Sequence, residues 1–494
     1  MTLDRGLSWE PHILLLKRET TRALNVLKTV ARKNFGPDRK TLLRLYWAIC
    51  SSKIEYGSQL YSSAGSTTLE KLNPVHNEAL RICTGAFRTS PTNSLQVEAG
   101  SPPLDLQRDE QLLRYIVRLE SLPEYKKDLN ALNDQYDDRY EVNNQRFVPI
   151  GTRARRLKQG MDFDTDPIQN TIAEIPPWLL KEVNICKEGS SNTKKNTTTP
   201  KLKQNFLSHM TKHSDSKHIY TDGSKSEEGV GFGVIHGPNL QHRARGTLPR
   251  EASVFSAELH AILKALSIIE NSIQLKWTIF SDSQASLQAI SHQNPKHPLV
   301  KAIQNTLSKL QNQHKKVVFC KVPSHIGIQG NEAADKVAVE SQKLPGLNTT
   351  RVHHRDYHFP IKRNIMKRWQ NRWDHIDDNI AHGNQRNKLR NTKPLVKPWP
   401  CVPGGNRKYE VKLTRLRIGH TRLTHGHFGG RPPECSSCGI SPLTTKHFLT
   451  DCQTTLPIRN LLKLPNDPKK LLGEQCPVAP LIRYLQEIEV LDEI

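Results

Sequence analysis

The sequence has no long apolar run, few cysteines for its length, and far fewer acidic than basic residues. No apolar stretch approaches the roughly 18 residues of a membrane-spanning helix, and the first residues lack the charged-then-apolar pattern of a signal peptide. The nine cysteines among 494 residues are mostly isolated, which excludes a disulfide framework and agrees with a reducing compartment. We therefore expect an intracellular protein, of the nucleus or cytoplasm, with no membrane partner.

The shortage of acids leaves a formal charge of +24 and a pI near 9.7. Because basic surface neutralises phosphates and releases counterions, we expect nucleic acid as the partner rather than a small-molecule substrate. Domains commonly span about 100–200 residues, so this length predicts two to four of them. The sequence contains no apparent internal repeat.

Four carboxylates in the middle of the chain stand in four different local contexts. Asp222 lies at the predicted end of a strand, and Glu258 projects from a predicted helix whose apolar residues recur at helical spacing. Asp282 closes a second predicted strand. Asp335 is predicted one turn into a last helix, with Asn331 as its cap. Four acids from two strand ends and two helices can converge.

Converging carboxylates cannot all stay ionised at reduced dielectric without counter-charge. Two Mg²⁺ ions about 3.5–4 Å apart would balance them, activate a water and stabilise the leaving oxygen of a phosphodiester. The acids therefore predict hydrolysis of a nucleic-acid backbone. Taken singly, each acid is more often a turn former or a solvated charge, so the prediction depends on their order and contexts together.

The segments around these acids resemble the successive motifs of type 1 ribonuclease H domains. They are Tyr-Thr-Asp-Gly-Ser (220–224), Ser-Ala-Glu-Leu (256–259), Ser-Asp-Ser (281–283) and Pro-Ser-His-Ile-Gly-Ile-Gln-Gly-Asn-Glu-Ala-Ala-Asp (323–335). The resemblance implies an α/β domain over 216–345, a mixed five-stranded sheet with helices on both faces that cleaves the RNA strand of RNA–DNA hybrids. It also implies two Mg²⁺ ions held by the four acids and a mobile histidine for proton transfer or product release. On that pattern the metal ligands are Asp222, Glu258, Asp282 and Asp335, and the histidine is His325.

The chain departs from some members of that family between two predicted helices. Only residues 292–298 separate the helix near 283–291 from the next one. There is no room for the extra basic helix with which some members grip the hybrid, so we expect substrate affinity to come from elsewhere.

Residues 1–125 are predicted to be mostly helical, with apolar residues at helical spacing and Asp38 as a helix cap. Three stretches resemble the region after the palm in jockey-type non-LTR retrotransposon reverse transcriptases: 4–13, 46–57 and 98–104. The resemblance implies thumb-like helices. It also leads us to expect that the fingers and palm of a polymerase are missing from this chain.

Residues 126–215 are predicted to be a linker, because their polar stretches are too hydrophilic to offset the entropy cost of ordering the backbone. Tyr136-Asp137-Asp138 has the wrong order for the aromatic-x-Asp-Asp hairpin of a polymerase, and we interpret it as solvated linker. We therefore expect no DNA synthesis by this chain.

Residues 346–430 form the most basic part of the sequence. Between Arg351 and Arg431, 19 Lys or Arg stand against five acids, which gives +14 of the total +24. Aromatic residues interleave with these cations, a common arrangement for holding nucleic acid without sequence preference. The alternative is a solvated basic helix whose tryptophans pack on a neighbouring domain. We favour packing for the tryptophans and nucleic acid for the charge as a whole.

Residues 431–455 contain a paired-cysteine turn followed by a histidine and a cysteine. Such a set supplies the four ligands of a structural Zn²⁺ in a module too small to bury its own core: Cys435, Cys438, His447 and Cys452. It resembles the CCHC knuckle at the C-terminal end of jockey-like polyproteins, with a longer gap than retroviral knuckles have. The alternatives are a chance arrangement and three rival ligands, which could equally contact phosphate or pack: His420, His425 and His427. The tail, 456–494, predicts an amphipathic helix of unknown purpose.

Together these resemblances identify the C-terminal part of a non-LTR retrotransposon polyprotein with thumb-like helices, a ribonuclease H domain and a zinc knuckle. The leading hypothesis for its function is metal-dependent endonucleolytic cleavage of RNA in RNA–DNA hybrids. The alternative is a non-catalytic remnant that binds nucleic acid through its basic surface and knuckle.

Overall fold

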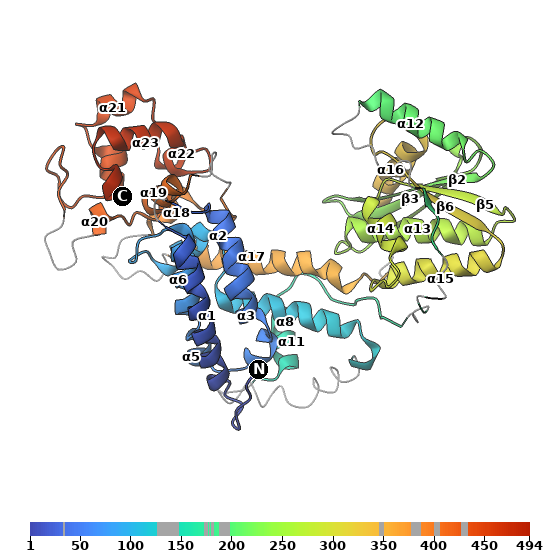
Figure 1. Ribbon diagram of the computed structural model, residues 1–494, viewed down its shortest axis with the longest axis horizontal. Helices are drawn as coiled ribbons and strands as arrows, with labels where there is room; N and C mark the ends of the chain where they lie inside the picture. The colour runs from blue at the N-terminus through green and yellow to red at the C-terminus, as the bar shows by residue number, and fades with distance from the viewer. Residues whose placement is uncertain are drawn as a thin grey trace. The chain divides into compact units, whose positions relative to one another are not determined.

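The computed structural model describes residues 1–32, 35–125, 148–171, 176, 178, 182–186, 198–344, 350–376, 387–399, 406–425 and 433–494 (Figure 1). Its contacts divide the chain into two compact units, one comprising 1–113, 136–161 and 362–494 and the other 114–135 and 162–361. None of the helices in the described ranges combines the length and apolar character that a membrane-spanning helix needs.

A six-stranded mixed sheet forms the centre of the second unit, in the order β1-β6-β5-β2-β3-β4. The strands are β1 (Ile185–Cys186), β2 (Lys217–Lys225), β3 (Val230–His236), β4 (His242–Leu248), β5 (Lys276–Ser281) and β6 (Lys316–Lys321). The β2-β3-β4 part is antiparallel, whereas β2-β5, β5-β6 and β6-β1 pair in parallel. The prediction of five strands was wrong by one, because β1 adds a short edge strand from the stretch predicted to be linker.

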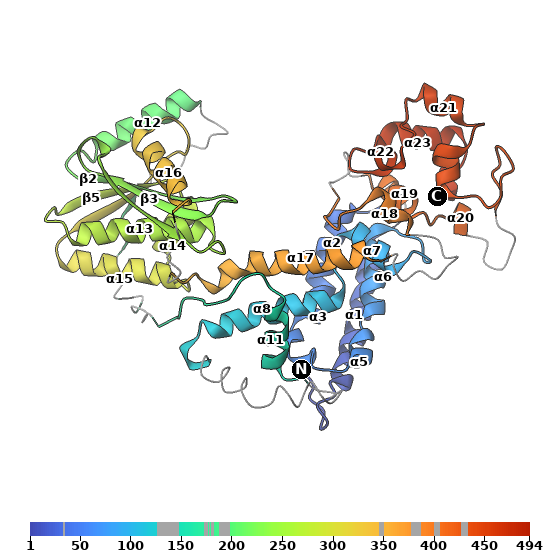
Figure 2. The same ribbon diagram turned by 180° about the vertical axis from the view of Figure 1, so that it is seen from behind.

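Helices cover both faces of this sheet (Figures 1 and 2). One face packs against α13 (Val254–Glu270), α14 (Gln284–Ser291) and α15 (Pro298–Asn312), and the other against α12 (Thr199–Thr211) and α16 (Gln329–Ser341). Short 3₁₀ segments occur at η2 (Pro238–Leu240) and η3 (His354–Tyr357). Residues 292–297 join α14 to α15 without an intervening helix, as the sequence predicted.

Part of the stretch predicted to be a linker is ordered structure. Its described residues include α11 (Ile150–Gln159), β1 and α12, and α12 buries Leu202 and Phe206 against the sheet. These two residues are four apart and share one helix face, a signal that the average polarity of the surrounding sequence concealed. The Tyr136-Asp137-Asp138 stretch lies outside the described residues.

The first unit is helical in its described part, which agrees with the helices predicted over 1–125. Its N-terminal elements are α1 (Glu10–Val30), α2 (Arg39–Tyr46), η1 (Trp47–Ser51), α3 (Ser52–Glu55), α4 (Ser58–Tyr61), α5 (Ser66–Glu70), α6 (Asn73–Thr84) and α7 (Thr92–Ala99). α8 (Leu104–Glu120) and α17 (His358–Asp374) each contain a position where the chain passes from one unit to the other. Its C-terminal elements are α18 (Lys388–Thr392), α19 (Arg407–Ile418), α20 (Arg422–His425), η4 (His447–Asp451), α21 (Leu456–Leu461), α22 (Pro468–Leu472), α23 (Val478–Glu487) and η5 (Leu491–Glu493). Asp38 caps α2 by accepting a hydrogen bond from the Thr41 N–H, as predicted.

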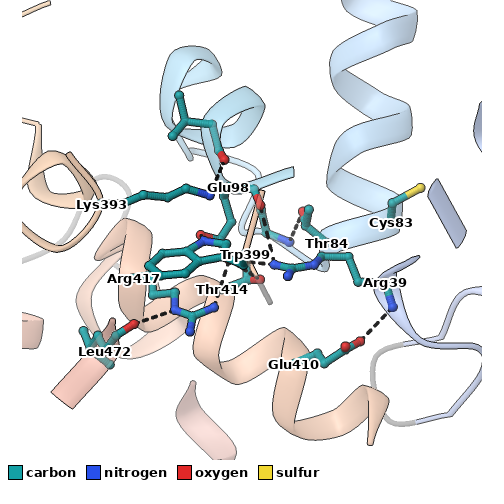
Figure 3. A network of polar contacts seen from close by, with 12 residues as sticks. Arg39, Cys83, Thr84, Glu98, Lys393, Trp399, Glu410, Thr414, Arg417 and Leu472 are labelled. Carbon is teal, nitrogen blue, oxygen red and sulfur yellow. Dashed lines mark hydrogen bonds and ion pairs between the residues drawn. The ribbon is translucent and has the colours of Figure 1, made fainter. Parts of the chain in front are cut away.

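Glu98 in α7 lies fully buried between two arginines from distant parts of the chain (Figure 3). Its Oε1 is 3.0 Å from Arg39 Nη1 and 3.5 Å from Arg417 Nη1. Thr414 donates to the same oxygen, and the Trp399 indole donates to Oε2. The N-terminal helices and the predicted basic segment therefore share one buried polar core, where the sequence predicted separate domains.

Five cations of the predicted nucleic-acid-binding segment are buried in this unit: Lys393, Arg407, Lys412, Arg415 and Arg417. Each donates a hydrogen bond to a main-chain carbonyl of the N-terminal helices or of the C-terminal tail. Trp369, Trp373 and Trp399 are buried as well, which confirms the packing alternative for the tryptophans. Phosphate contact by this segment would fall to its exposed cations, such as Lys362 and Lys367.

The tail packs onto the predicted zinc knuckle. α23 buries Leu481, Tyr484 and Leu485 in one apolar cluster with Cys435 and Cys452. The Tyr484 hydroxyl also donates to the main chain of η4, at a distance of 2.5 Å. The expectation of a module without its own core therefore needs correction, because the tail supplies that core.

Candidate functional site

The four predicted acids come from four elements of the second unit. Asp222 lies in β2, Glu258 in α13, Asp282 directly after β5, and Asp335 in α16. The structure brings one carboxylate oxygen of Asp222, of Glu258 and of Asp282 within 4.8 Å of one another. Asp335 is outside this group of three, but it lies close enough to Asp222 to raise the pKa of that acid. The convergence predicted for the four side chains is thus present, with Asp335 at its edge.

β2 does not end at Asp222 as predicted. Parallel pairing with β5 stops at Thr221↔Ser281, but antiparallel pairing with β3 continues to Lys225↔Val230. Asp222 therefore occupies the first position at which one side of the strand is open. The sequence pattern predicted where β2 stops pairing with β5, but it did not predict that β2 continues to pair with β3.

Gly223 allows the N-terminal part of α13 to approach β2 closely. A Cβ at this position would lie 2.4 Å from the Glu258 nitrogen and 2.7 Å from the Ala257 carbonyl carbon. Any larger residue would push the helix away from the strand. The backbone N–H of Gly223 also acts on both acids, because it lowers the pKa of Asp222 and that of Glu258 against the effect of burial. This one glycine thus sets the spacing of two acids.

Burial and mutual repulsion make these acids hard to ionise. Burial, then the charges of Asp282 and Asp335, raise the pKa of Asp222 to about 8. Burial, then the charge of Asp222, raise the pKa of Glu258 to about 9. Burial also raises the pKa of Asp282 above its ordinary value. A cation placed among these oxygens would reverse the effect by favouring the charged forms.

Asn331 is a site residue that sequence reasoning misplaced. It was predicted to cap the last helix, but α16 already begins at Gln329, with Ile328 in the cap position. Its side chain is buried, and its amide lowers the pKa of Asp282 against the effect of burial. An asparagine four residues before a predicted metal ligand, one helical turn away, was the signal available in the sequence.

His325 lies in the loop between β6 and α16. Its side chain is exposed and its backbone adopts the left-handed region, with φ 52°. The histidine acts electrostatically on Asp282, because a positive imidazolium there lowers the pKa of that acid. An exposed imidazole beside the acids agrees with the mobile role that the family resemblance implies.

The acids present fit a divalent cation. Glu258 is 5 % exposed, and its Oε2 atom is buried without a hydrogen-bond partner. A buried carboxylate oxygen with no donor is costly unless a cation or water reaches it. Clustered carboxylate oxygens are the ligands that Mg²⁺ prefers.

Residues 214–343 match the RNase H family, and this range contains the whole four-acid site. The chain contains a ribonuclease H domain. The domain is also similar to a curated relative, Ribonuclease H1 of Rattus norvegicus, with 27% identity over 183 residues. That match covers 33% of this chain and 63% of the ribonuclease H1 sequence, so the chain spans less than two thirds of that relative.

Outside the ribonuclease H domain, the structure also brings together the predicted zinc ligands. One ligand atom each of Cys435, Cys438, His447 and Cys452 lies within 4.8 Å of the others, and Cys438 Sγ is 3.2 Å from His447 Nε2. Burial alone would raise the pKa of the Cys452 thiol, but hydrogen bonds from Thr455 and other donors lower it. A lowered thiol pKa favours the thiolate that binds metal.

The rival ligands do not join this cluster among the described residues. His420 and His425 stack on each other with ring centroids 3.8 Å apart and hydrogen-bond to Thr89 and Thr424. His427 lies outside the described residues.

Proposed function

We propose that this protein hydrolyses the RNA strand of RNA–DNA hybrids with the help of Mg²⁺. The convergence of the Asp222, Glu258 and Asp282 carboxylates carries the proposal; two of them are buried, one is half-buried, and Asp335 lies close enough to raise the pKa of Asp222. Such a cluster would be unfavourable in its ionised form without a cation, since burial and repulsion raise the pKa values of Asp222 and Glu258 well above ordinary values. The match to the RNase H family supports the reaction class.

Asp222, Glu258, Asp282 and Asp335 would hold the ions. When bound, Mg²⁺ supplies Lewis acidity at the scissile phosphate and lowers the pKa of a water. The protein holds the carboxylates at fixed positions, because α13 and α16 pack in apolar clusters on opposite faces of the sheet, and both clusters include residues of β2 and β5. Asn331 orients the Asp282 carboxylate through its hydrogen bond.

His325 would move a proton at the edge of the site. Its exposed imidazole lies in a loop, so it can accept a proton from a nucleophilic water or donate one to the departing oxygen. Discrimination against DNA duplexes would depend on contacts to the 2′-hydroxyl of the RNA strand.

We further propose that Cys435, Cys438, His447 and Cys452 bind a structural Zn²⁺. With the resemblances around residues 4–13, 46–57 and 98–104, this knuckle supports an origin in a non-LTR retrotransposon polyprotein. The tail would keep the knuckle residues packed when the metal is removed, because Tyr484 and its neighbours bury two of the cysteines.

The test is a labelled RNA–DNA hybrid incubated with the protein, with and without Mg²⁺. Mg²⁺-dependent cleavage of the RNA strand is expected, and Asp222→Asn should remove it while hybrid binding remains, because the substitution is isosteric. Asp215→Asn is the matched control, since Asp215 is an exposed partner of Lys276. Binding without any cleavage would favour the non-catalytic alternative, and equal cleavage of DNA duplexes would contradict the proposed substrate.

A further inference from the structure

A second cluster of metal-binding side chains lies in the ribonuclease H unit and shares no residue with the acids. It consists of two cysteines and two histidines, with one ligand atom of each within 4.8 Å of the others: Cys186, His209, His213 and Cys320. His209 is 8 % exposed and Cys320 is fully buried, while Cys186 and His213 are half-buried. Nothing in the hydrolysis of a phosphodiester uses these side chains.

The topology of the sheet brings the two cysteines together. Cys186 in β1 and Cys320 in β6 are direct partners in a parallel pair of strands. Because paired residues on neighbouring strands point to the same face, both thiols project toward the face that α12 and α16 cover. Two thiols that are 134 positions apart in the sequence therefore lie side by side.

The two histidines come from the end of α12. His209 lies in its last turn and His213 follows two residues after its end, so they are four positions apart and face the same side. Their ring centroids are 5.3 Å apart. His-x₃-His is a spacing that structural zinc sites use.

The distances suit a single tetrahedral ion. Cys186 Sγ lies 2.8 Å from His209 Nε2. With metal–sulfur bonds of about 2.3 Å and metal–nitrogen bonds of about 2.0–2.1 Å, a tetrahedron separates its ligand atoms by about 3.3–3.8 Å. Four atoms already within 4.8 Å of one another need only small side-chain adjustments to reach that geometry.

We propose that Cys186, His209, His213 and Cys320 bind a structural Zn²⁺. Two thiolates and two imidazoles are ligands that favour zinc, and four protein ligands leave no open position for a substrate. The site is distinct from the knuckle in the other unit and from the carboxylates.

The ion would fasten two added elements to the ribonuclease H domain. Three of the four ligands lie before residue 214, where the family match begins, and only Cys320 lies within it. β1 pairs with β6 through just two residues, so without the metal its attachment is weak. Zinc would hold β1 on β6, which would otherwise present an open edge, and keep Phe206 of α12 on Phe280.

Two other arrangements use the same residues without a metal. Cys186 and Cys320 could form a disulfide, because they are cross-strand partners. Alternatively, the cysteines and histidines could simply pack as small apolar and aromatic groups. Metal content and thiol chemistry separate these arrangements from the proposal.

The experiment measures zinc by mass spectrometry in the full chain, purified without chelator. All variants carry Cys438→Ser, which removes one ligand of the knuckle, so that zinc bound by the knuckle does not contribute to the measured zinc content. In that background we expect one zinc per chain, falling nearly to zero with Cys186→Ala added. His213→Gln, a milder change at a half-buried position, should give the same loss. His236→Gln is the matched histidine control and should leave the single zinc in place, since His236 lies in β3 outside the cluster.

Each alternative predicts a different result. Absence of zinc in the Cys438→Ser protein, with two fewer thiols available to alkylation in denaturant without reductant, would show a disulfide and overturn the proposal. Absence of zinc with all thiols available would show plain packing and overturn it equally. If Cys186→Ala fails to fold, the His213→Gln protein decides. None of these measurements requires hybrid cleavage. The proposed zinc site is therefore tested independently of the proposed ribonuclease activity.

Chelation gives a second readout. Removing zinc from the Cys438→Ser protein should speed proteolysis near α12 at least several-fold, and added Zn²⁺ should restore protection. The His213→Gln protein should be cleaved rapidly with or without Zn²⁺. Unchanged proteolysis of the Cys438→Ser protein after its zinc is removed would contradict the fastening role.

Discussion

The side-chain amide of Asn331 in α16 lowers the pKa of the Asp282 carboxyl, which directly follows β5. This contact joins the helix that carries Asp335 to the strand that carries another acid of the site. Asn331 is 3 % exposed, and its Oδ1 atom is buried without a hydrogen-bond partner. The amide nitrogen is therefore the atom that can donate to the Asp282 carboxylate.

We expect Asn331→Ala to weaken the response to Mg²⁺ without abolishing activity. Loss of a residue that orients a metal ligand typically costs about 10–100-fold in metal affinity or activity. The measurement is the initial rate of hybrid cleavage across a Mg²⁺ titration, in which the midpoint should move to higher concentration. Asn271→Ala, at the exposed end of α13, is the control. A wild-type titration curve for Asn331→Ala would show that the hydrogen bond has no role in the site.

His325→Ala should slow turnover less than loss of Asp222 does. Proton transfer by a positioned side chain typically contributes about 10²–10⁴-fold, while the metal-binding acids support every other part of the reaction. The measurement is kcat at saturating hybrid and Mg²⁺. His314→Ala is a close control, because His314 is also an exposed histidine with positive φ. An entirely inactive His325→Ala protein that still binds Mg²⁺ would reverse this ranking.

Four histidines of the second unit whose rings contact one another in a chain should make its stability depend on pH. Burial lowers the pKa of His297, His354 and His358 to about 4 and that of His353 to about 2. Since an unfolded histidine titrates near about 6.5, the unfolded chain binds more protons between these values. The stabilising contribution is therefore complete above about pH 6.5 and is lost as the pH falls toward 4.

The measurement is urea unfolding at pH 7.5 and pH 5, compared between the wild type and His353→Gln. The variant should lose less stability on acidification than the wild type. Asp222 and Glu258 have raised pKa values, which make the free energy of unfolding fall as the pH rises, opposite to the effect of the histidines. Comparing the variant with the wild type at each pH separates the two contributions. His292→Gln is the exposed control. An equal loss in His353→Gln and wild type would contradict the assignment.

Replacing Glu98 should destabilise the first unit strongly. Glu98→Gln leaves Arg39 and Arg417 buried without their shared negative charge, a change that commonly costs about 3–5 kcal/mol. The exposed pair Glu10–Lys71 supplies the control, because Glu10→Gln should cost at most about 1 kcal/mol. Chemical denaturation monitored by tryptophan fluorescence measures both. Similar small losses in the two variants would mean that Glu98 does not hold the helices together.

Local pattern in the sequence was sufficient for the elements around the site. The helical spacing of Leu259, Ile262 and Leu266 predicted α13 and its buried face, and all three are fully buried. The acids could be assigned because each follows a recognisable strand or helix signal. The amphipathic tail helix was predicted for the same reason. Such signals are short-range, since each depends on residues within a few turns or one strand.

The contacts between segments far apart in the chain could not be predicted from the sequence. Cys186 and Cys320 lie side by side because of the register in which β1 pairs with β6. The periodicity of either segment does not indicate which strand will be its neighbour. The burial of Arg407 and Arg417 likewise depends on carbonyls more than 50 residues away, so their charges were interpreted as a surface for phosphate. Composition and motifs thus predicted the chemistry of the four acids and the knuckle. Only the tertiary structure decided which cations are exposed and that a second cysteine–histidine cluster exists, because both depend on which distant segments pack together.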